Sequence, residues 1–463
     1  MSDRRLVRYA ATSARLVAGA AVAAAAVVGT VAAIAAPWPQ YTAEPVRLQT
    51  TPAPSDTVLA CDGPLLALGR SADSASGLSA AAASDIVSGP ADAAASTGSL
   101  SGATGSSDGD APVLSAAPRD GAPTAIAAAT SATAASDDLV GFAASACRPP
   151  LAESWLVGGA STTGANDLIE LANPGSVPAT VQLSVYGAQG VATPPSGQNI
   201  VVPAGERRIV PLAGLLLGEE SPVVRVVSSG APVHAALQAS LTRVLLPGGV
   251  EQVAPTAQAD TRLVMPGVQV IETAAGQAGT LLRLLAPGAD TTATVTLVPV
   301  DAVGTAPAPV EIALTAGLPT SLDLSGIAAG AYTVEATAGA PIVGATWSTT
   351  GFGEGADFAW YAASPEIVEP SLVAVAPGAG ATVVLAGGAT EAAVTLTPVE
   401  GGTPVSATVA AGMSVSVPVG DGVYRLETTG PVRAAVTYAG ASALASYPLW
   451  PADAAAAAVT VLP

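Results

Sequence analysis

Beyond residue 150, apolar and polar residues alternate over short stretches that are separated by Gly, Pro and Ser. A period of two predicts strands with one buried face, and turns at a spacing of about 8–12 residues are typical of an antiparallel β-sandwich. The predicted strands include residues 200–202, 208–212, 223–227, 310–314, 321–324, 332–336, 405–409, 414–417 and 424–427. The pattern therefore predicts an all-β fold for this part of the chain.

Two sequence strings recur three times in the same order, which indicates an internal repeat. The first string is an alternating strand that begins at Ala179, Ala293 and Ala393. The second string is a Gly and a Pro followed by an apolar strand, and it begins at Gly230, Gly339 and Gly430.

The repeat predicts three tandem immunoglobulin-like antiparallel β-sandwich modules, over residues 151–261, 262–370 and 371–463. A β-propeller is the competing all-β interpretation, but its blades contain only about 40–50 residues, far fewer than these units. A last predicted strand, residues 459–463, could close onto an earlier module.

The N-terminal segment is apolar on every side. Leu16 to Ala36 are 21 uncharged residues, enough to cross a bilayer as a helix. Four Arg residues precede them, which predicts a cytoplasmic basic tail at 1–15, a membrane segment at 16–36 and extracellular bulk. Because Ala33-Ile34-Ala35 resembles a signal-peptidase site, a retained single-pass anchor and a cleaved signal of a secreted protein both remain open. The Pro-rich residues 37–54 predict an extended exit segment.

The chain has two cysteines, Cys61 and Cys147. In an exported protein an even count predicts a disulfide, although two unpaired buried thiols would give the same count. Between them, residues 71–138 are mostly Ala, Ser, Gly, Thr and Asp without an aromatic residue. Such a composition buries too little apolar surface to offset ordering entropy. We therefore predict a disulfide-closed extracellular region, 37–150, with a disordered low-complexity insertion at 71–138.

Composition and charge exclude several functions. The net charge is −19 and all 16 basic residues are Arg, so the acidic surface predicts no nucleic-acid partner. The absence of Lys removes a phosphate-loop lysine and Schiff-base chemistry. One His and two Cys leave no zinc set, and the acidic pair Glu354 and Asp357 lacks the spacing of a calcium loop. No cofactor and no metal site is expected.

His234 is the only histidine, so a Ser-His-Asp hydrolase would depend on it. The repeat places Val343 and Arg433 at the equivalent positions, which favours a structural role in a strand. One Gly-x-Ser-x-Gly string, residues 105–109, lies inside the predicted disordered insertion and lacks the strand and helix of a nucleophile elbow. No catalytic residue is expected, and the chain is predicted not to be an enzyme.

Aromatic residues make up only 3% of the chain, yet several gather in one stretch near the boundary of the second and third modules. They are Trp347, Phe352, Phe358, Trp360 and Tyr361. Exposed aromatic side chains could stack on sugar rings or on a protein partner, and packing between modules is the alternative. This cluster is the candidate partner contact, with a cell-wall glycan or an envelope protein as the partner.

Several strings together resemble a known family. They are the N-terminal apolar segment, Ala60-Cys61-Asp62-Gly63-Pro64, Cys147-Arg-Pro-Pro, Trp155-Leu-Val-Gly-Gly, and Leu171-Ala-Asn173-Pro174-Gly175 before Ala179-Thr-Val181. The chain resembles the actinobacterial proteins grouped as domain of unknown function 5719. The resemblance implies a cell-envelope protein and assigns no chemistry. Asp62 departs from the Cys-Pro-Gly-Pro form associated with that family.

These observations lead to an expected function. We expect a non-enzymatic, membrane-anchored extracellular protein of the cell envelope that acts as a scaffold or adhesion surface. One alternative is an accessory subunit that docks an envelope glycosyltransferase or transporter. Another is a secreted hydrolase that uses His234.

Overall fold

The computed structural model describes residues 3–35, 48–50, 55–69, 77–89, 95–102, 109–120, 122–273, 277–440, 442–451 and 459–461. The chain divides into two compact units, one of Met1–Pro52 with Ala458–Pro463 and one of Ala53–Ala457. The predicted exit segment, 37–54, lies outside the described residues apart from 48–50.

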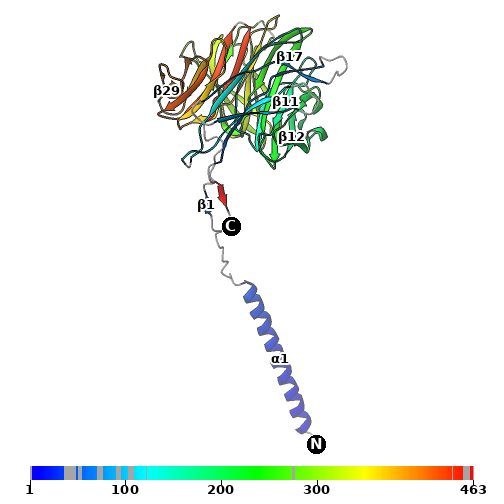
Figure 1. Ribbon diagram of the computed structural model, residues 1–463. Helices are drawn as coiled ribbons and strands as arrows, with labels where there is room; N and C mark the ends of the chain where they lie inside the picture. Colours follow the sequence, from blue (N-terminus) through cyan, green and yellow to red (C-terminus); the bar gives the residue numbers. More distant parts are fainter. Residues whose placement is uncertain are drawn as a thin grey trace. The chain divides into compact units, whose positions relative to one another are not determined.

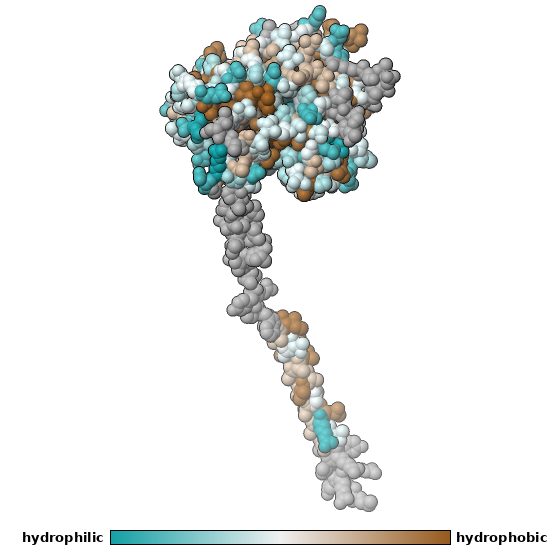
Figure 2. Space-filling model, in the orientation of Figure 1, coloured by the Kyte–Doolittle hydropathy of each residue, from teal (hydrophilic) through white to brown (hydrophobic). Residues whose placement is uncertain are grey.

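The first unit contains helix α1, Asp3–Ala35. Residues Ala11–Ile34 within it have a mean hydropathy of 2.2 and no buried side chain, and Figure 2 shows the visible face of α1 as mostly apolar. One N-terminal helix apolar enough to cross a membrane is therefore present, as an anchor or as a signal sequence. Strand β1, Leu48–Thr50, pairs antiparallel with β35, Val459–Val461, so the last strand does not close onto a predicted module.

The second unit is built almost wholly of strands, with β29 on the opposite side of it from β12 (Figure 1). Residues 153–253 form two antiparallel sheets around one core cluster. The first sheet contains β10 (Glu153–Val157), β16 (Val223–Ser229), β12 (Ala179–Gly187), β13 (Gly190–Ala192) and β14 (Ile200–Val202). The second has the order β15 (Arg207–Pro211), β11 (Leu168–Ala172), β17 (His234–Arg243) and β18 (Leu246–Val253). Two short 3-10 helices, η1 (Pro195–Gly197) and η2 (Leu212–Gly214), connect strands here.

Residues 260–362 are organised around one long strand, β24 (Gly330–Thr349), which pairs with four other strands. Its first half pairs with β19 (Asp260–Val270) and β21 (Thr291–Pro299). Its second half pairs with β20 (Thr280–Leu285) and β25 (Phe358–Ala362). The edges are β22 (Val310–Leu314), beside β21, and β23 (Thr320–Asp323), beside β20.

Residues 366–448 again form two antiparallel sheets around a shared core. The first contains β26 (Glu366–Ile367), β33 (Val432–Gly440), β28 (Thr382–Gly387), β31 (Ser414–Pro418) and β34 (Ala443–Pro448). The second contains β27 (Ser371–Val375), β32 (Gly422–Thr428), β29 (Ala392–Pro398) and β30 (Val405–Val409).

Strand register relates the three copies of the second repeated string. In each copy a leucine faces a small residue of that string across the ladder. The three pairs are Leu171 with Ala235, Leu284 with Gly344 and Leu385 with Ala434. The all-β fold class is confirmed. The number of immunoglobulin-like modules and their boundaries stay a prediction.

The prediction of disorder across residues 71–138 is wrong for the part of it that the structure describes. Strands β4 (Leu78–Ala82), β5 (Asp85–Gly89), β6 (Ala95–Leu100), β7 (Ala111–Ala116) and β8 (Ala127–Ser136) lie within it. They pair with one another or with β2 (Thr57–Ala60), β3 (Leu65–Leu68) and β9 (Leu139–Ala146).

The reason for the error is tertiary packing. Ala127 and Ala129 of β8 belong to the same core cluster as residues of the last pair of sheets, including Leu426 and Tyr438. An alanine-rich strand can therefore lie buried because its neighbours supply the large side chains. Residues 71–76, 90–94, 103–108 and 121 of the insertion lie outside the described part.

Candidate functional site

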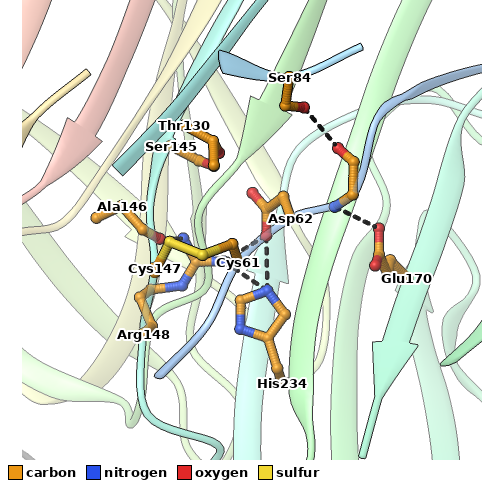
Figure 3. The surroundings of a disulfide bond; sticks show 11 residues. Cys61, Asp62, Ser84, Thr130, Ser145, Ala146, Cys147, Arg148, Glu170 and His234 are labelled. Atoms are coloured by element: carbon orange, nitrogen blue, oxygen red, sulfur yellow. Dashed lines mark hydrogen bonds and ion pairs between the residues drawn. A yellow bond between two sulfur atoms is a disulfide. The ribbon is translucent and has the colours of Figure 1, made fainter. Parts of the chain in front are cut away.

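A disulfide between Cys61 and Cys147 joins the end of β2 to the end of β9, as predicted (Figure 3). Both cysteines are buried. The flanking residues Ala60 and Arg148 exchange two backbone hydrogen bonds of 2.9 Å each, so the two segments form a short ladder beside the bond. The disulfide therefore closes a region that backbone pairing already brings together.

Asp62, next to the disulfide, lies in a buried charged cluster with Arg148 and His234 (Figure 3). Arg148 Nη2 is 3.0 Å and His234 Nε2 is 2.6 Å from Asp62 Oδ1. Burial alone would raise the pKa of Asp62, but the Arg148 charge and the hydrogen bond from His234 outweigh it and lower the pKa to about 2. Asp62 is therefore a buried carboxylate anion held by two partners.

A second buried pair lies beside the first. Arg207 Nη1 is 3.3 Å from Glu170 Oε1, and the backbone N–H of Gly63 donates to Glu170 Oε2 at 3.4 Å. Burial raises the pKa of Glu170, and the charge of Arg207 opposes that rise. A Cβ atom at Gly63 would lie 2.6 Å from Arg207 Nη1, so glycine leaves room for the guanidinium. The Cys61-Asp62-Gly63 string thus supplies the disulfide, the anion and the space for a cation.

This cluster joins the N-terminal region to the first pair of sheets. Glu170 lies on β11, Arg207 on β15 and His234 on β17, whereas Asp62 precedes β3. His234 has only 2% of its surface exposed and its Nε2 faces Asp62, so a substrate has no open approach to the ring. The ring Nε2 of His234 lies against Asp62 and Arg148, which agrees with the structural role that the repeat favoured over the hydrolase alternative.

The aromatic residues predicted as a partner contact separate into different environments. Phe358, Trp360 and Tyr361 on β25 are buried, whereas Trp347 and Phe352 are partly exposed. Trp347 faces Trp360 across the β24–β25 ladder, and the centroids of the Trp347 and Phe358 rings are 6.2 Å apart. Tyr361 belongs to the core around β19 and β24. The five residues therefore do not form one exposed patch.

Trp347, Phe358 and Trp360 line a small pocket with a volume of about 170 Å³. The pocket lies between the sheets of residues 153–253 and the sheet of residues 260–362. Its polar side is lined by Asp167, before β11, and Arg283, on β20, together with Glu220, Ser240 and Ser321. The rest of the lining is mainly apolar, and the volume suits a group the size of one ring. A larger hollow of about 740 Å³ beside Trp450 has an Ala- and Pro-rich lining without convergent charged groups.

The polar groups of the small pocket are held by the protein itself. Asp167 accepts backbone N–H bonds from Ala160 at 2.6 Å and Ser240 at 2.9 Å, and burial raises its pKa to about 7 against these bonds. Arg283 donates to the carbonyl oxygens of Gly159 and Pro222 at 3.0 and 2.8 Å, and its guanidinium lies 4.7 Å from the centre of the Trp360 ring. Because Arg283 covers the Trp360 ring, the partly exposed ring of Trp347 is the aromatic surface left for a ligand.

Sequence reasoning considered Asp357 only as a metal ligand and missed its role as a junction. Its buried carboxylate accepts backbone N–H bonds from Phe142, Val250 and Leu444 at 2.9, 3.3 and 3.1 Å. These donors belong to β9, β18 and β34, three strands far apart in the sequence. Burial raises the pKa of Asp357 to about 7, and the backbone donors oppose the rise.

Two features accompany this junction. Gly141 and Gly249 directly precede two of the donors, and a Cβ atom at either would lie 2.6 Å from Asp357 Oδ1. Glu251 is also fully buried, and burial together with the negative charge of Asp357 raises its pKa well above the usual value. With its carboxylate occupied by backbone donors, Asp357 is not free to bind calcium with Glu354. In the part of the chain that the structure describes, no group of three His, Cys, Asp or Glu is placed to hold a metal ion.

Together these features define a disulfide-closed, all-β protein with an N-terminal apolar helix and a small aromatic pocket. A family model described as "Family of unknown function (DUF5719)" matches residues 102–420, and the chain belongs to this family. The predicted resemblance is confirmed. None of the curated proteins compared with the chain matches it.

Proposed function

We propose that this chain is a non-enzymatic, membrane-anchored protein of the cell envelope whose β-sheet unit lies outside the cell as a scaffold or adhesion surface. The observation that carries the proposal is the combination of one N-terminal apolar helix with an internal disulfide. Disulfides persist in oxidising compartments and are rare in the cytosol, so the bond supports export of residues 53–457.

The chemistry of the buried ionisable groups supports a role without catalysis. Asp62, Glu170 and His234 are enclosed with protein partners, and Asp357 accepts three backbone donors. These groups hold segments together and have no open face for a substrate. Their arrangement suits a rigid platform.

The aromatic pocket is the adhesion contact in this proposal. The apolar face of a sugar ring stacks on aromatic side chains, and Trp347 offers a partly exposed ring beside Phe358. A pocket of about 170 Å³ fits one such ring of a cell-wall glycan. The acidic chain is poorly suited to strongly anionic polymers, because its net charge of −19 would repel them.

Localisation tests the first part of the proposal. Protease added to intact cells should degrade the β-sheet unit while α1 stays with the membrane fraction, and thiol alkylation without reductant should leave Cys61 and Cys147 unmodified. A chain found in the cytosol with both thiols reactive would overturn the proposal.

Glycan binding tests the second part. The full chain in detergent should be retained by isolated cell-wall glycan, and Trp347→Ala should reduce retention. Trp450→Ala is the matched control, because Trp450 is also partly exposed but lines the other hollow. Equal retention of the Trp347 variant and the parent, at equal thermal stability, would remove the pocket from the proposal.

A further inference from the structure

The turn between β17 and β18 has residues that are unusual for a two-residue β-hairpin turn. Arg243 pairs with Leu246, which leaves Val244 and Leu245 as the two turn residues. Two-residue hairpin turns favour Gly, Asn and Asp, because one or both positions require a positive φ. Val244 has a φ of 61° and is the only β-branched residue with a positive φ in the described part of the chain. This backbone conformation is unfavourable for valine.

The same residues expose an unusual apolar surface. Val244 is 96% exposed, Leu245 86% and Leu246 45%. Among the described residues of the β-sheet unit, the other exposed large apolar side chains are isolated along the sequence. A comparable two-residue turn, between β8 and β9, contains Asp137 and Asp138 instead. Solubility and turn geometry would both favour polar residues at positions 244 and 245, so folding alone does not explain the apolar pair.

The base of the hairpin is braced. The Arg243 guanidinium lies 5.3 Å from the centre of the Phe352 ring, and its Nη1 donates to the carbonyl oxygen of Gly248 at 3.4 Å. Phe352 lies in the loop that connects β24 and β25. An aromatic ring and a cation therefore flank three exposed apolar side chains, an arrangement found in segments that lie at the boundary between lipid headgroups and hydrocarbon.

We propose that the hairpin tip, residues 243–246, inserts into the surface of an uncharged lipid bilayer. The proposal rests on the membrane location proposed above, which places a bilayer within the surroundings of the chain. The net charge of −19 would repel an anionic surface, so insertion depends on the apolar side chains rather than on headgroup charge. Binding is therefore insensitive to salt.

The test uses the full chain in phosphatidylcholine vesicles. Because Cys61 and Cys147 form a disulfide, a cysteine introduced by Leu245→Cys is available for selective labelling with an environment-sensitive fluorophore. The label should show blue-shifted emission and be quenched by spin-labelled lipid, in low and in high salt. Val303→Cys, at a 74% exposed site in another loop, is the matched control and should stay water-exposed and unquenched.

Equal emission and no quenching at both positions, with α1 still retained in the vesicles after alkaline extraction, would overturn the proposal. The label would also stay unquenched if the tip bound a pocket on a partner protein, because the quencher in the lipid would not reach it. That outcome would likewise overturn the proposal. Release of the chain by alkaline extraction would instead refute the membrane anchor. If vesicles added to the released chain still quenched the label at position 245, that result would support insertion of the hairpin tip.

A double substitution separates a binding role from a structural one. Val244→Gly with Leu245→Asn installs a favoured turn, because Val244 alone of the two turn residues has a positive φ. It should raise the thermal unfolding temperature by about 1–3 °C through relief of backbone strain. The same change should abolish quenching of a label at Leu246→Cys. Lowered stability together with unchanged quenching would show that the apolar turn serves the fold, and would overturn the proposal.

Discussion

Replacing Asp357 by alanine should strongly destabilise the β-sheet unit. The carboxylate accepts three buried backbone N–H bonds, from Phe142, Val250 and Leu444. Truncation removes all three acceptors at once, and the donors stay buried because β9, β18 and β34 enclose them. Asp357→Asn keeps the side-chain volume but retains only one acceptor oxygen and adds an N–H₂ group that faces the donors.

The magnitude follows from the number of donors. Leaving a buried donor without a partner costs about 1–3 kcal/mol. Three donors at the lower end of this range give a loss of about 3 kcal/mol in the free energy of unfolding for Asp357→Ala. For a unit of about 400 residues this corresponds to a fall of about 3–4 °C in the unfolding temperature, because the entropy of unfolding grows with chain length. The asparagine variant should lose about half as much, because one oxygen still accepts.

Urea unfolding of the full chain in detergent, followed by tryptophan fluorescence, measures the effect. Asp323→Ala is the control, because exposed Asp323 accepts one local bond, from Ser325 N at 2.7 Å, and its loss should cost less than about 0.5 kcal/mol. If Asp357→Ala and Asp323→Ala unfolded at the same urea concentration, the carboxylate would not be a junction between the strands and the reasoning would fail.

Three other properties can be measured. Replacing both Cys61 and Cys147 by serine should lower the free energy of unfolding by about 4 kcal/mol, because the disulfide closes a loop of 86 residues. Urea midpoints of the variant, and of the parent with and without reductant, would measure this loss, and an unchanged midpoint would contradict the prediction. His234→Ala should cost about 2–4 kcal/mol by removing a buried partner of Asp62, whereas His234→Gln, which keeps a donor, should cost less; equal losses in thermal denaturation would argue against the hydrogen bond. Stability should rise on acidification from pH 8 to pH 5, because the folded-state pKa values of Asp167 and Asp357 are raised to about 7, so the folded chain binds protons that the unfolded chain releases. That contribution is complete below the ordinary aspartate pKa and is lost as pH rises through 7, whereas the opposite contribution of Asp62 is lost only below about pH 4, towards its lowered pKa of about 2. Urea midpoints at pH 5 and pH 8 test this, and Asp167→Asn should flatten the dependence.

Sequence alone predicted the elements whose signals are local. The strands at 200–202, 310–314 and 405–409 lie where alternation predicted them, because a half-buried strand shows its two faces in its own sequence. The apolar helix and the disulfide were predicted for the same reason: length, charge and cysteine count are properties of the chain itself. The repeat likewise predicted an equivalence that the registers of Leu171, Leu284 and Leu385 display.

Tertiary structure decided what depends on neighbours. The alanine-rich β8 is buried because large side chains from distant strands cover it, and composition within 71–138 cannot report those partners. Asp357 became a junction because three strands that are far apart in the sequence direct backbone N–H groups towards it, and no spacing in the sequence encodes that convergence. The aromatic cluster separated into pocket and core because strand register sets which ring faces which sheet. The alternation of apolar and polar residues is a property of each segment's own sequence, whereas burial depends on which other segments pack against it.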